Sequence, residues 1–146
     1  MKSEDQQKEG IQPYLKFRIG NTGLAVPLPK VWMILHGESI DQVPDAPESV
    51  LGKVYFSNGP VPVLDPEKSL PVKAGKIDRQ DSSLLLMALQ QHYFGLPVDT
   101  IEGIDKISSR HIHFGTAEIN CETIHIVDPE KLLTSKDMQS FLEINA

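Results

Sequence analysis

The stretch VYFSNGPVPVL, residues 54–64, contains the clearest turn motif in the chain. Two apolar runs, VYF and VPVL, flank the four residues Ser57, Asn58, Gly59 and Pro60. An Asn-Gly pair readily supplies the positive φ values that tight hairpin turns require. The stretch therefore predicts a β-hairpin.

The preceding sequence predicts a second hairpin and a further strand. In residues 15–19, apolar Leu, Phe and Ile alternate with Lys and Arg, which is typical of a half-buried strand. The turn sequence GNTG at 20–23 then leads into a second alternating run at 24–28. The short apolar run at 31–35 lies between a proline and a glycine, and its brevity favours another strand.

The second half of the chain is also β-rich. Residues 84–89 are continuously apolar, as expected of a strand buried on both faces, and residues 93–98 follow a short polar turn. Ile112, Phe114, Ile124 and Ile126 suggest at least two closing strands, with bends at residues 115 and 120–122.

These patterns predict a mostly β fold with one domain over residues 13–146. Residues 1–12 are expected to form a disordered tail, because the first ten residues are polar and cannot repay their ordering entropy by burial. The charged stretch 69–82 is expected to link one subdomain, about 13–68, to a second, about 83–133. A short C-terminal helix at 134–144, with an apolar stripe, would pack on the first subdomain.

Composition excludes several classes of function. The net charge of -6 and a pI near 5.3 argue against binding to nucleic acid or anionic lipid. The longest apolar run, residues 84–89, is too short to cross a bilayer, so we expect no membrane insertion. A single cysteine agrees with a reducing compartment, and a cytoplasmic location is expected.

Several segments resemble the CheW-like domain family in the expected order. LAVPLPKV at 24–31 resembles a strand–loop–strand region of the family, and PESVLG at 47–52 followed by VPVLD at 61–65 resembles its proline-led turn, hairpin and closing aspartate. The segments 94–104 and 124–133 resemble its Gly-hydrophobic-x-Val-Asp region and its closing strand and helix start. Together they cover nearly the whole chain from residue 14.

The resemblance implies two small five-stranded, SH3-like β-barrel subdomains packed together. It also implies a non-enzymatic adaptor of chemotaxis signal transduction that couples receptors to a two-component system. One subdomain would bind the regulatory domain of a CheA-type histidine kinase, and the tips of methyl-accepting chemoreceptors would bind near the groove between the subdomains. Neither catalysis nor a cofactor is expected.

The resemblance also suggests a partner-binding surface, with two departures from the family pattern. Ser57 stands where the family usually has an arginine, and Met33 stands where many members carry an acidic residue. A changed rim charge alters partner choice, so the alternative is a divergent CheW-like module in a non-classical chemosensory pathway. The expected partner-binding residues are Val31, Met33, Val50, Tyr55, Ser57 and Asn58.

Residues that could support catalysis were weighed against structural roles. His111 and His113, with Cys121 or His125, could supply zinc ligands to a small metal-dependent enzyme, but their spacing fits no standard metal motif. Three aspartates that end apolar runs, at 65, 99 and 128, could share acid and base roles. Backbone hydrogen bonds that stop each strand are the favoured interpretation.

Overall fold

The computed structural model describes residues 10–37, 39–45, 48–56, 59–73, 83–89 and 92–133. The predicted C-terminal helix at 134–144 lies outside the described residues, as do residues 1–9 of the predicted tail. The tail was expected to extend to residue 12, but the first strand already begins at Ile11. Ile11 is apolar and pairs with Ser108, which explains why the strand begins before residue 13.

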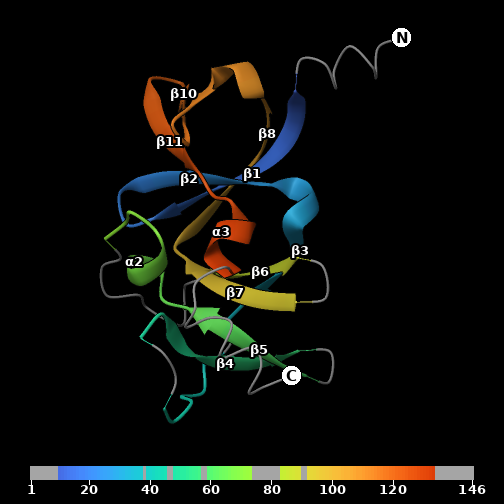
Figure 1. Cartoon of the computed structure of the whole chain (residues 1–146), viewed down its shortest axis with the longest axis vertical. Coiled ribbons are helices and arrows are strands. Elements are labelled where there is room, and N and C mark those ends of the chain that lie inside the picture. The colour runs from blue at the N-terminus through green and yellow to red at the C-terminus, as the bar shows by residue number, and fades with distance from the viewer. Residues whose placement is uncertain are drawn as a thin grey trace.

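The described residues form two antiparallel-rich β sheets, which confirms the mostly β prediction (Figure 1). Sheet A has six strands in the order β8-β1-β2-β11-β10-β9. Its strands are β1 (Ile11–Ile19), β2 (Thr22–Pro27), β8 (Thr100–Ser108), β9 (Ile112–His113), β10 (Thr116–Ile119) and β11 (Glu122–Ile126). The β1–β2 hairpin forms around the predicted turn at residues 20–21, and β11 joins β2 in parallel.

Sheet B has five strands in the order β3-β6-β7-β5-β4. Its strands are β3 (Val31–His36), β4 (Val50–Phe56), β5 (Gly59–Leu64), β6 (Ser83–Leu89) and β7 (His92–Val98). The stretch 54–64 lies in the β4–β5 hairpin, as predicted. Among the described residues, three short helices connect strands: η1 (Leu28–Lys30), α2 (Pro66–Ser69) and η2 (Ser109–His111). A fourth, α3 (Pro129–Leu133), follows β11.

The chain does not divide into sequential halves, so the predicted subdomain boundaries are wrong. Sheet A combines residues 11–27 with residues 100–126, whereas sheet B takes the intervening strands from Val31 to Val98. The segment 69–82, predicted as the linker between subdomains, instead lies between two strands of sheet B. Alternation identifies strands but carries no information on which distant strands pair.

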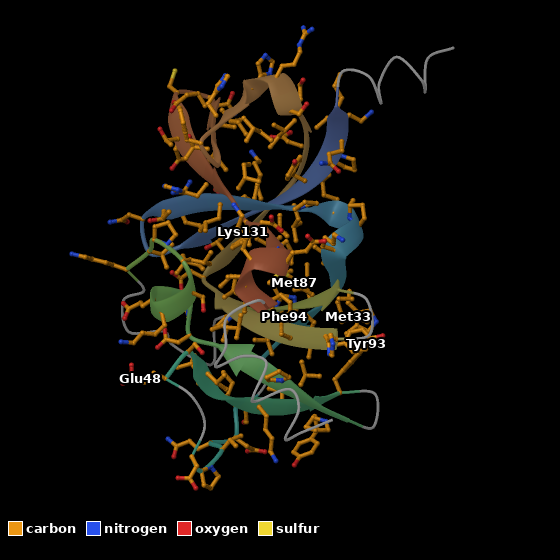
Figure 2. The ribbon with its side chains drawn as sticks, in the orientation of Figure 1. Met33, Glu48, Met87, Tyr93, Phe94 and Lys131 are labelled. Atoms are coloured by element: carbon orange, nitrogen blue, oxygen red, sulfur yellow. The ribbon has the colours of Figure 1, made fainter. Side chains whose placement is uncertain are left out.

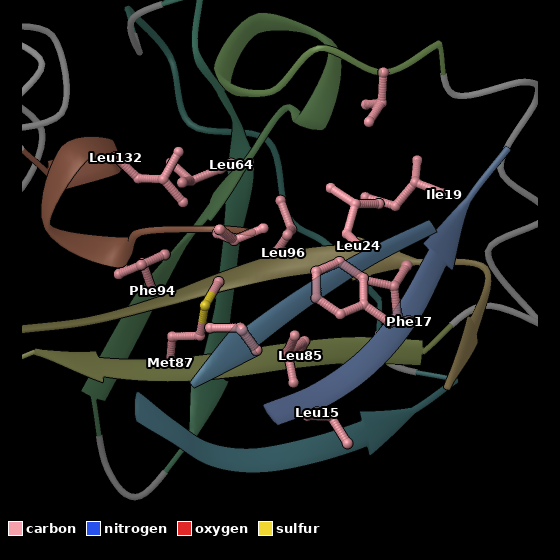
Figure 3. Packing of buried hydrophobic residues seen from close by; sticks show 14 of the residues in the cluster. Leu15, Phe17, Ile19, Leu24, Leu64, Leu85, Met87, Phe94, Leu96 and Leu132 are labelled. Atoms are coloured by element: carbon pink, nitrogen blue, oxygen red, sulfur yellow. The ribbon is translucent and has the colours of Figure 1, made fainter. Parts of the chain in front are cut away.

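One hydrophobic core joins the two sheets. Phe17 and Leu24 of sheet A and Leu85 and Phe94 of sheet B have no exposed surface and belong to the same buried cluster (Figure 3). Leu15, Phe17 and Ile19 of β1 face this core, and the lysine and arginine between them face the other side. Because the core draws on both sheets, their packing holds the molecule together.

Each sheet is rolled, which leaves a smaller core inside each one. Trp32 on edge strand β3 lies 4.9 Å, ring centroid to ring centroid, from Phe56 on the opposite edge strand β4. The edge strands of sheet A, β8 and β9, are joined by the three residues of η2. A second cluster fills sheet A around Ile107 and Ile124, and a third fills sheet B around Val63 and Leu86.

Candidate partner-binding surface

The six residues expected to bind partners differ in their exposure to solvent. Met33 on β3 and Tyr55 on β4 are exposed, with 41% and 60% of their surface accessible, whereas Val31 is half-buried. Val50 is buried in the core between the sheets, where it packs against other apolar residues, so the structure does not support a partner contact there. Two residues, Ser57 and Asn58, lie outside the described residues.

A β-bulge in β3 orients Trp32 and Met33 differently. Val31 pairs with Met87 and Met33 pairs with Leu86, so one extra residue lies between two consecutive positions of β6. A bulge re-aims side chains at the edge of a sheet. The indole of Trp32 packs against the interior cluster of sheet B, while Met33 remains exposed.

Three aromatic rings gather where β3 and β7 begin and β4 ends. The Trp32 ring lies 4.2 Å from the Tyr93 ring in a tilted arrangement and meets Phe56 edge-on. Figure 2 shows Met33 and Tyr93 at this same end of sheet B. We call Trp32, Met33, Tyr55, Phe56 and Tyr93 the aromatic end of sheet B.

The aromatic end carries few charges. The described strand ends and the adjoining 3-10 turn, residues 28–33, 53–56, 59–61, 87–89 and 92–94, contain neither Asp nor Glu, but the exposed Asp41 pairs through its backbone with Lys53. The Lys53 ammonium lies 5.1 Å from the ring centroid of Tyr55. Exposed aromatic surface rimmed by polar groups is typical of a protein-binding site.

A charged network ties three strands of sheet A together. The guanidinium of Arg18 on β1 donates two hydrogen bonds of 2.8 Å to the carboxylate of Glu122 and lies 3.3 Å from Glu102 on β8. These hydrogen bonds lower the pKa of the Glu122 carboxyl group and raise the pKa of Arg18. Alternation predicted that Arg18 faces away from the core, but its two carboxylate partners are more than eighty residues away along the chain.

The candidate zinc ligands do not form a ligand group. His113 and His125 flank Thr116 on neighbouring strands, and His111 lies in η2 beside a hollow of about 410 Å³. Within the described part of the chain, no group of three or more His, Cys, Asp or Glu side chains is placed to hold a metal ion. The proposed set of three histidines therefore gains no support from the geometry.

The three aspartates that end apolar runs accept backbone hydrogen bonds, as the structural interpretation predicted. Asp65 caps α2 by accepting from the backbone N–H of Glu67 at 3.0 Å. Asp128 accepts from the N–H of Glu130 at 3.1 Å, and Asp99 accepts from the N–H of Gly20 at 2.6 Å. These carboxylates fix turns and helix starts.

Phe114 differs most from the expectation. It was predicted to belong to a closing strand, but it lies in the tight turn between β9 and β10 with φ of 52° and a fully exposed ring. The Phe-Gly pair that it forms with Gly115 is the local feature that could have indicated a turn, because glycine accepts positive φ.

The fold defines a class of protein: a small β-rich domain in which two rolled sheets share one core. The chain belongs to the CheW-like domain family, whose model matches residues 13–137. That family consists of scaffold proteins rather than enzymes. No helix among the described residues is long and apolar enough to cross a membrane.

A solved structure shows the same fold. The scaffolding protein TtCheW from Thermoanaerobacter tengcongensis superposes with a TM-score of 0.74 at 19% sequence identity, covering 86% of this chain and 94% of that one. No curated protein matches the sequence significantly.

Proposed function

We propose that this protein is a cytoplasmic, non-enzymatic adaptor that couples chemoreceptors to a CheA-type histidine kinase. Membership of the CheW-like family over residues 13–137 carries the proposal. The structural likeness to a scaffolding protein shows that this chain has the fold of a protein with such a role. An adaptor needs a rigid body with exposed contact surfaces, and a shared core between two sheets provides the rigidity.

The aromatic end of sheet B is our candidate surface for the kinase. It combines exposed Met33, Tyr55 and Tyr93 with the half-buried ring of Trp32. Aromatic side chains contribute most of the binding energy where they enter a partner's pocket. Holding Trp32 between two other rings reduces the side-chain entropy that binding would otherwise cost.

A calorimetric titration tests the kinase contact. The purified chain would be titrated with the regulatory domain of each CheA-type kinase encoded in the same genome. Saturable one-to-one binding to one of them is the expected result. Failure of every regulatory domain to bind, with the chain shown to be folded by circular dichroism, would contradict the proposal.

The receptor contact needs a separate test, because kinase binding alone would not make the protein a coupler. We expect a chemoreceptor tip fragment to bind the preformed complex of this chain and the kinase domain. Size-exclusion chromatography of the three components would then show one ternary peak. Competition between receptor fragment and kinase domain would argue against simultaneous coupling.

The second candidate is a CheW-like module directed to a partner outside classical chemotaxis. Met33 and Ser57 favour it, because both stand where charged residues are usual in the family. It predicts that regulatory domains from classical chemotaxis kinases bind weakly or not at all, whereas one divergent kinase in the same genome binds tightly. The titration across all encoded kinases therefore distinguishes the two candidates.

A further inference from the structure

We infer that Asp99 is a positioning residue that fixes the angle between sheet A and sheet B by clamping the crossover between them to the β1–β2 turn. The inference concerns the conformation of the molecule and goes beyond the proposed function. Only its consequence for coupling rests on that function, because a coupler that contacts two partners needs its contact surfaces in a fixed relation.

Among the described strands, the chain passes from one sheet to the other at two points. The first crossover, from β2 to β3, runs through the three residues of η1. The second, from β7 to β8, is the single residue Asp99. On either side of it, Val98 pairs with Ser83 in sheet B and Thr100 pairs with Arg18 in sheet A. Rotation about the backbone bonds of Asp99 therefore turns one sheet relative to the other.

Two hydrogen bonds hold this crossover against sheet A. The backbone N–H of Asp99 donates to the carbonyl of Arg18 at 2.9 Å, and its carboxylate accepts from the N–H of Gly20 at 2.6 Å. The second bond is charge-assisted and joins residues 79 positions apart. Because one bond comes from the backbone and the other from the side chain, they fix the orientation of Asp99 as well as its position. The other crossover has no such clamp, since η1 follows Pro27 without a side-chain cap.

The turn that receives the clamp also lies against the connection that follows α2 (Figure 1). Gly20 has φ of 59°, and a Cβ there would collide with the carbonyl oxygen of Lys73. Beside this close approach is a hollow of about 540 Å³, lined by Asn21 and Thr22 of the turn and by residues 67 and 70–73. Side chains do not fill the space next to the turn, so the bond to Asp99 supplies the directional constraint on this side of the molecule.

The shared core resists separation of the sheets but constrains their angle less. Burial of apolar surface is non-directional, whereas a hydrogen bond weakens as its angle changes. Val98 and Ile101 pack in or against this core, so they keep the crossover in place without the clamp. The side chain of Asp99 is exposed, and its removal leaves no buried charge unpaired. Loss of the carboxylate should therefore release the angle without unfolding either sheet.

Distances between spin labels on the two sheets provide the test. The labels would be attached in a parent chain that carries Cys121→Ser, Phe114→Cys and Tyr55→Cys, because the last two side chains are exposed on sheet A and sheet B respectively. Double electron–electron resonance measures the distribution of the distance between them. Adding Asp99→Ala should broaden this distribution by at least about 1.5-fold or shift its mean by at least about 3 Å, as expected when a hinge is released.

Two further variants distinguish a clamp from a general loss of structure. Asp99→Asn should keep the parent distribution, because the amide oxygen can still accept from the N–H of Gly20. The matched control is Asp128→Ala, another exposed aspartate, which accepts from the N–H of Glu130 only two residues away. It should also keep the parent distribution, since that bond stays within the start of α3. All three variants should unfold in urea in one cooperative transition.

One consequence concerns coupling. The aromatic end lies within sheet B, so Asp99→Ala should bind the kinase regulatory domain within about threefold of the wild-type Kd. Its ternary complex with the receptor fragment should be at least about threefold less abundant, because surfaces that move relative to each other must be ordered when both partners bind. Asp99→Asn should restore the complex. An undiminished ternary complex in Asp99→Ala would overturn this consequence.

The outcomes separate the inference from the proposed function. The parent distribution in Asp99→Ala would overturn the clamp and leave the adaptor function standing, as would equal broadening in Asp99→Asn or Asp128→Ala. Loss of the cooperative transition in Asp99→Ala would overturn it too, because the carboxylate would then stabilise the fold rather than the angle. Broadening in Asp99→Ala alone, in a chain that binds no kinase domain, would support the clamp and contradict the function.

Discussion

Replacing Phe17 by alanine should destabilise both sheets together. Phe17 lies in β1 of sheet A, has no exposed surface, and packs in the cluster that contains Leu85, Met87 and Leu96 of sheet B (Figure 3). Truncating a fully buried phenylalanine costs roughly 3–5 kcal/mol, which combines the lost burial and the cavity left behind. That loss is a large fraction of the roughly 5–15 kcal/mol that stabilises a typical domain.

Urea unfolding followed by two signals measures this effect. Trp32 is the single tryptophan of the chain and lies in β3 of sheet B, so its fluorescence reports on the sheet that does not contain Phe17. Far-ultraviolet circular dichroism reports on both sheets. With an m-value of about 2 kcal/mol per M, the midpoint should fall by roughly 2 M in both signals.

The matched control is Phe114→Ala, the same substitution at a fully exposed ring. It should change the free energy of unfolding by less than about 0.5 kcal/mol, because no burial is lost. A fluorescence midpoint that stays at the wild-type value in Phe17→Ala, while the dichroism signal splits into two transitions, would refute the shared core. The two sheets would then be independent folding units.

Three other predictions concern local features. Gly52→Ala should destabilise the chain by roughly 1–3 kcal/mol, because a Cβ there would collide with the backbone that pairs with β4. Gly59→Ala in the same hairpin meets open space and should be nearly neutral. The midpoints of urea unfolding compare the two variants. Cys121→Gly should stabilise by about 1 kcal/mol, since this turn residue has φ of 65°, and Cys121→Ala, which keeps a Cβ, should not; an equal gain from both would contradict the backbone argument. The hydrogen bonds from Arg18 lower the pKa of the Glu122 carboxyl group, so the stability that this ion pair contributes is present above the ordinary pKa of a glutamate and is lost as pH falls through the lower folded-state pKa. Thermal melts between about pH 6 and pH 3 should therefore show a smaller acid loss in Arg18→Gln than in the wild type. Parallel losses in the two proteins would show that the ion pair does not set this part of the acid sensitivity.

Local features of the fold were predicted from the sequence. Both hairpins were predicted because each depends on neighbours in the chain. The expected turn conformation at Gly59 was wrong, since Gly59 pairs with Phe56 as the first residue of β5 and does not have a positive φ. The roles of Asp65 and Asp128 were also predicted, since a carboxylate that follows a strand binds backbone N–H groups two residues on.

Long-range features were not predicted. The parallel pairing of β11 with β2 joins residues about a hundred positions apart, and this pairing and that of β1 with β8 together make sheet A from both ends of the described chain. Glu122 reaches Arg18 through the pairing of β11 with β2, whereas Glu102 reaches it through the pairing of β8 with β1. Alternation gives the face on which a side chain lies, but the neighbours on that face come from the sheet order.

The candidate surface was predicted in part. The resemblance indicated Met33 and Tyr55, which the structure exposes at one end of sheet B. It also indicated Val50, which the structure buries in the core. The sequence pattern does not distinguish a strand residue that faces the core from one that faces a partner. Trp32 and Tyr93 were not singled out together, since their contact bridges strands sixty residues apart.

Reconstitution of coupling is the most direct test of the central claim. Receptor signalling domains attached to vesicles would be mixed with full-length CheA-type kinase, with and without this chain, and the kinase that sediments with the vesicles would be quantified. The account predicts that kinase sediments with the receptors only when the chain is added, and that Tyr93→Ala greatly reduces this recruitment. Equal recruitment of kinase in the presence and absence of the chain, with every kinase encoded in the same genome, would contradict the account.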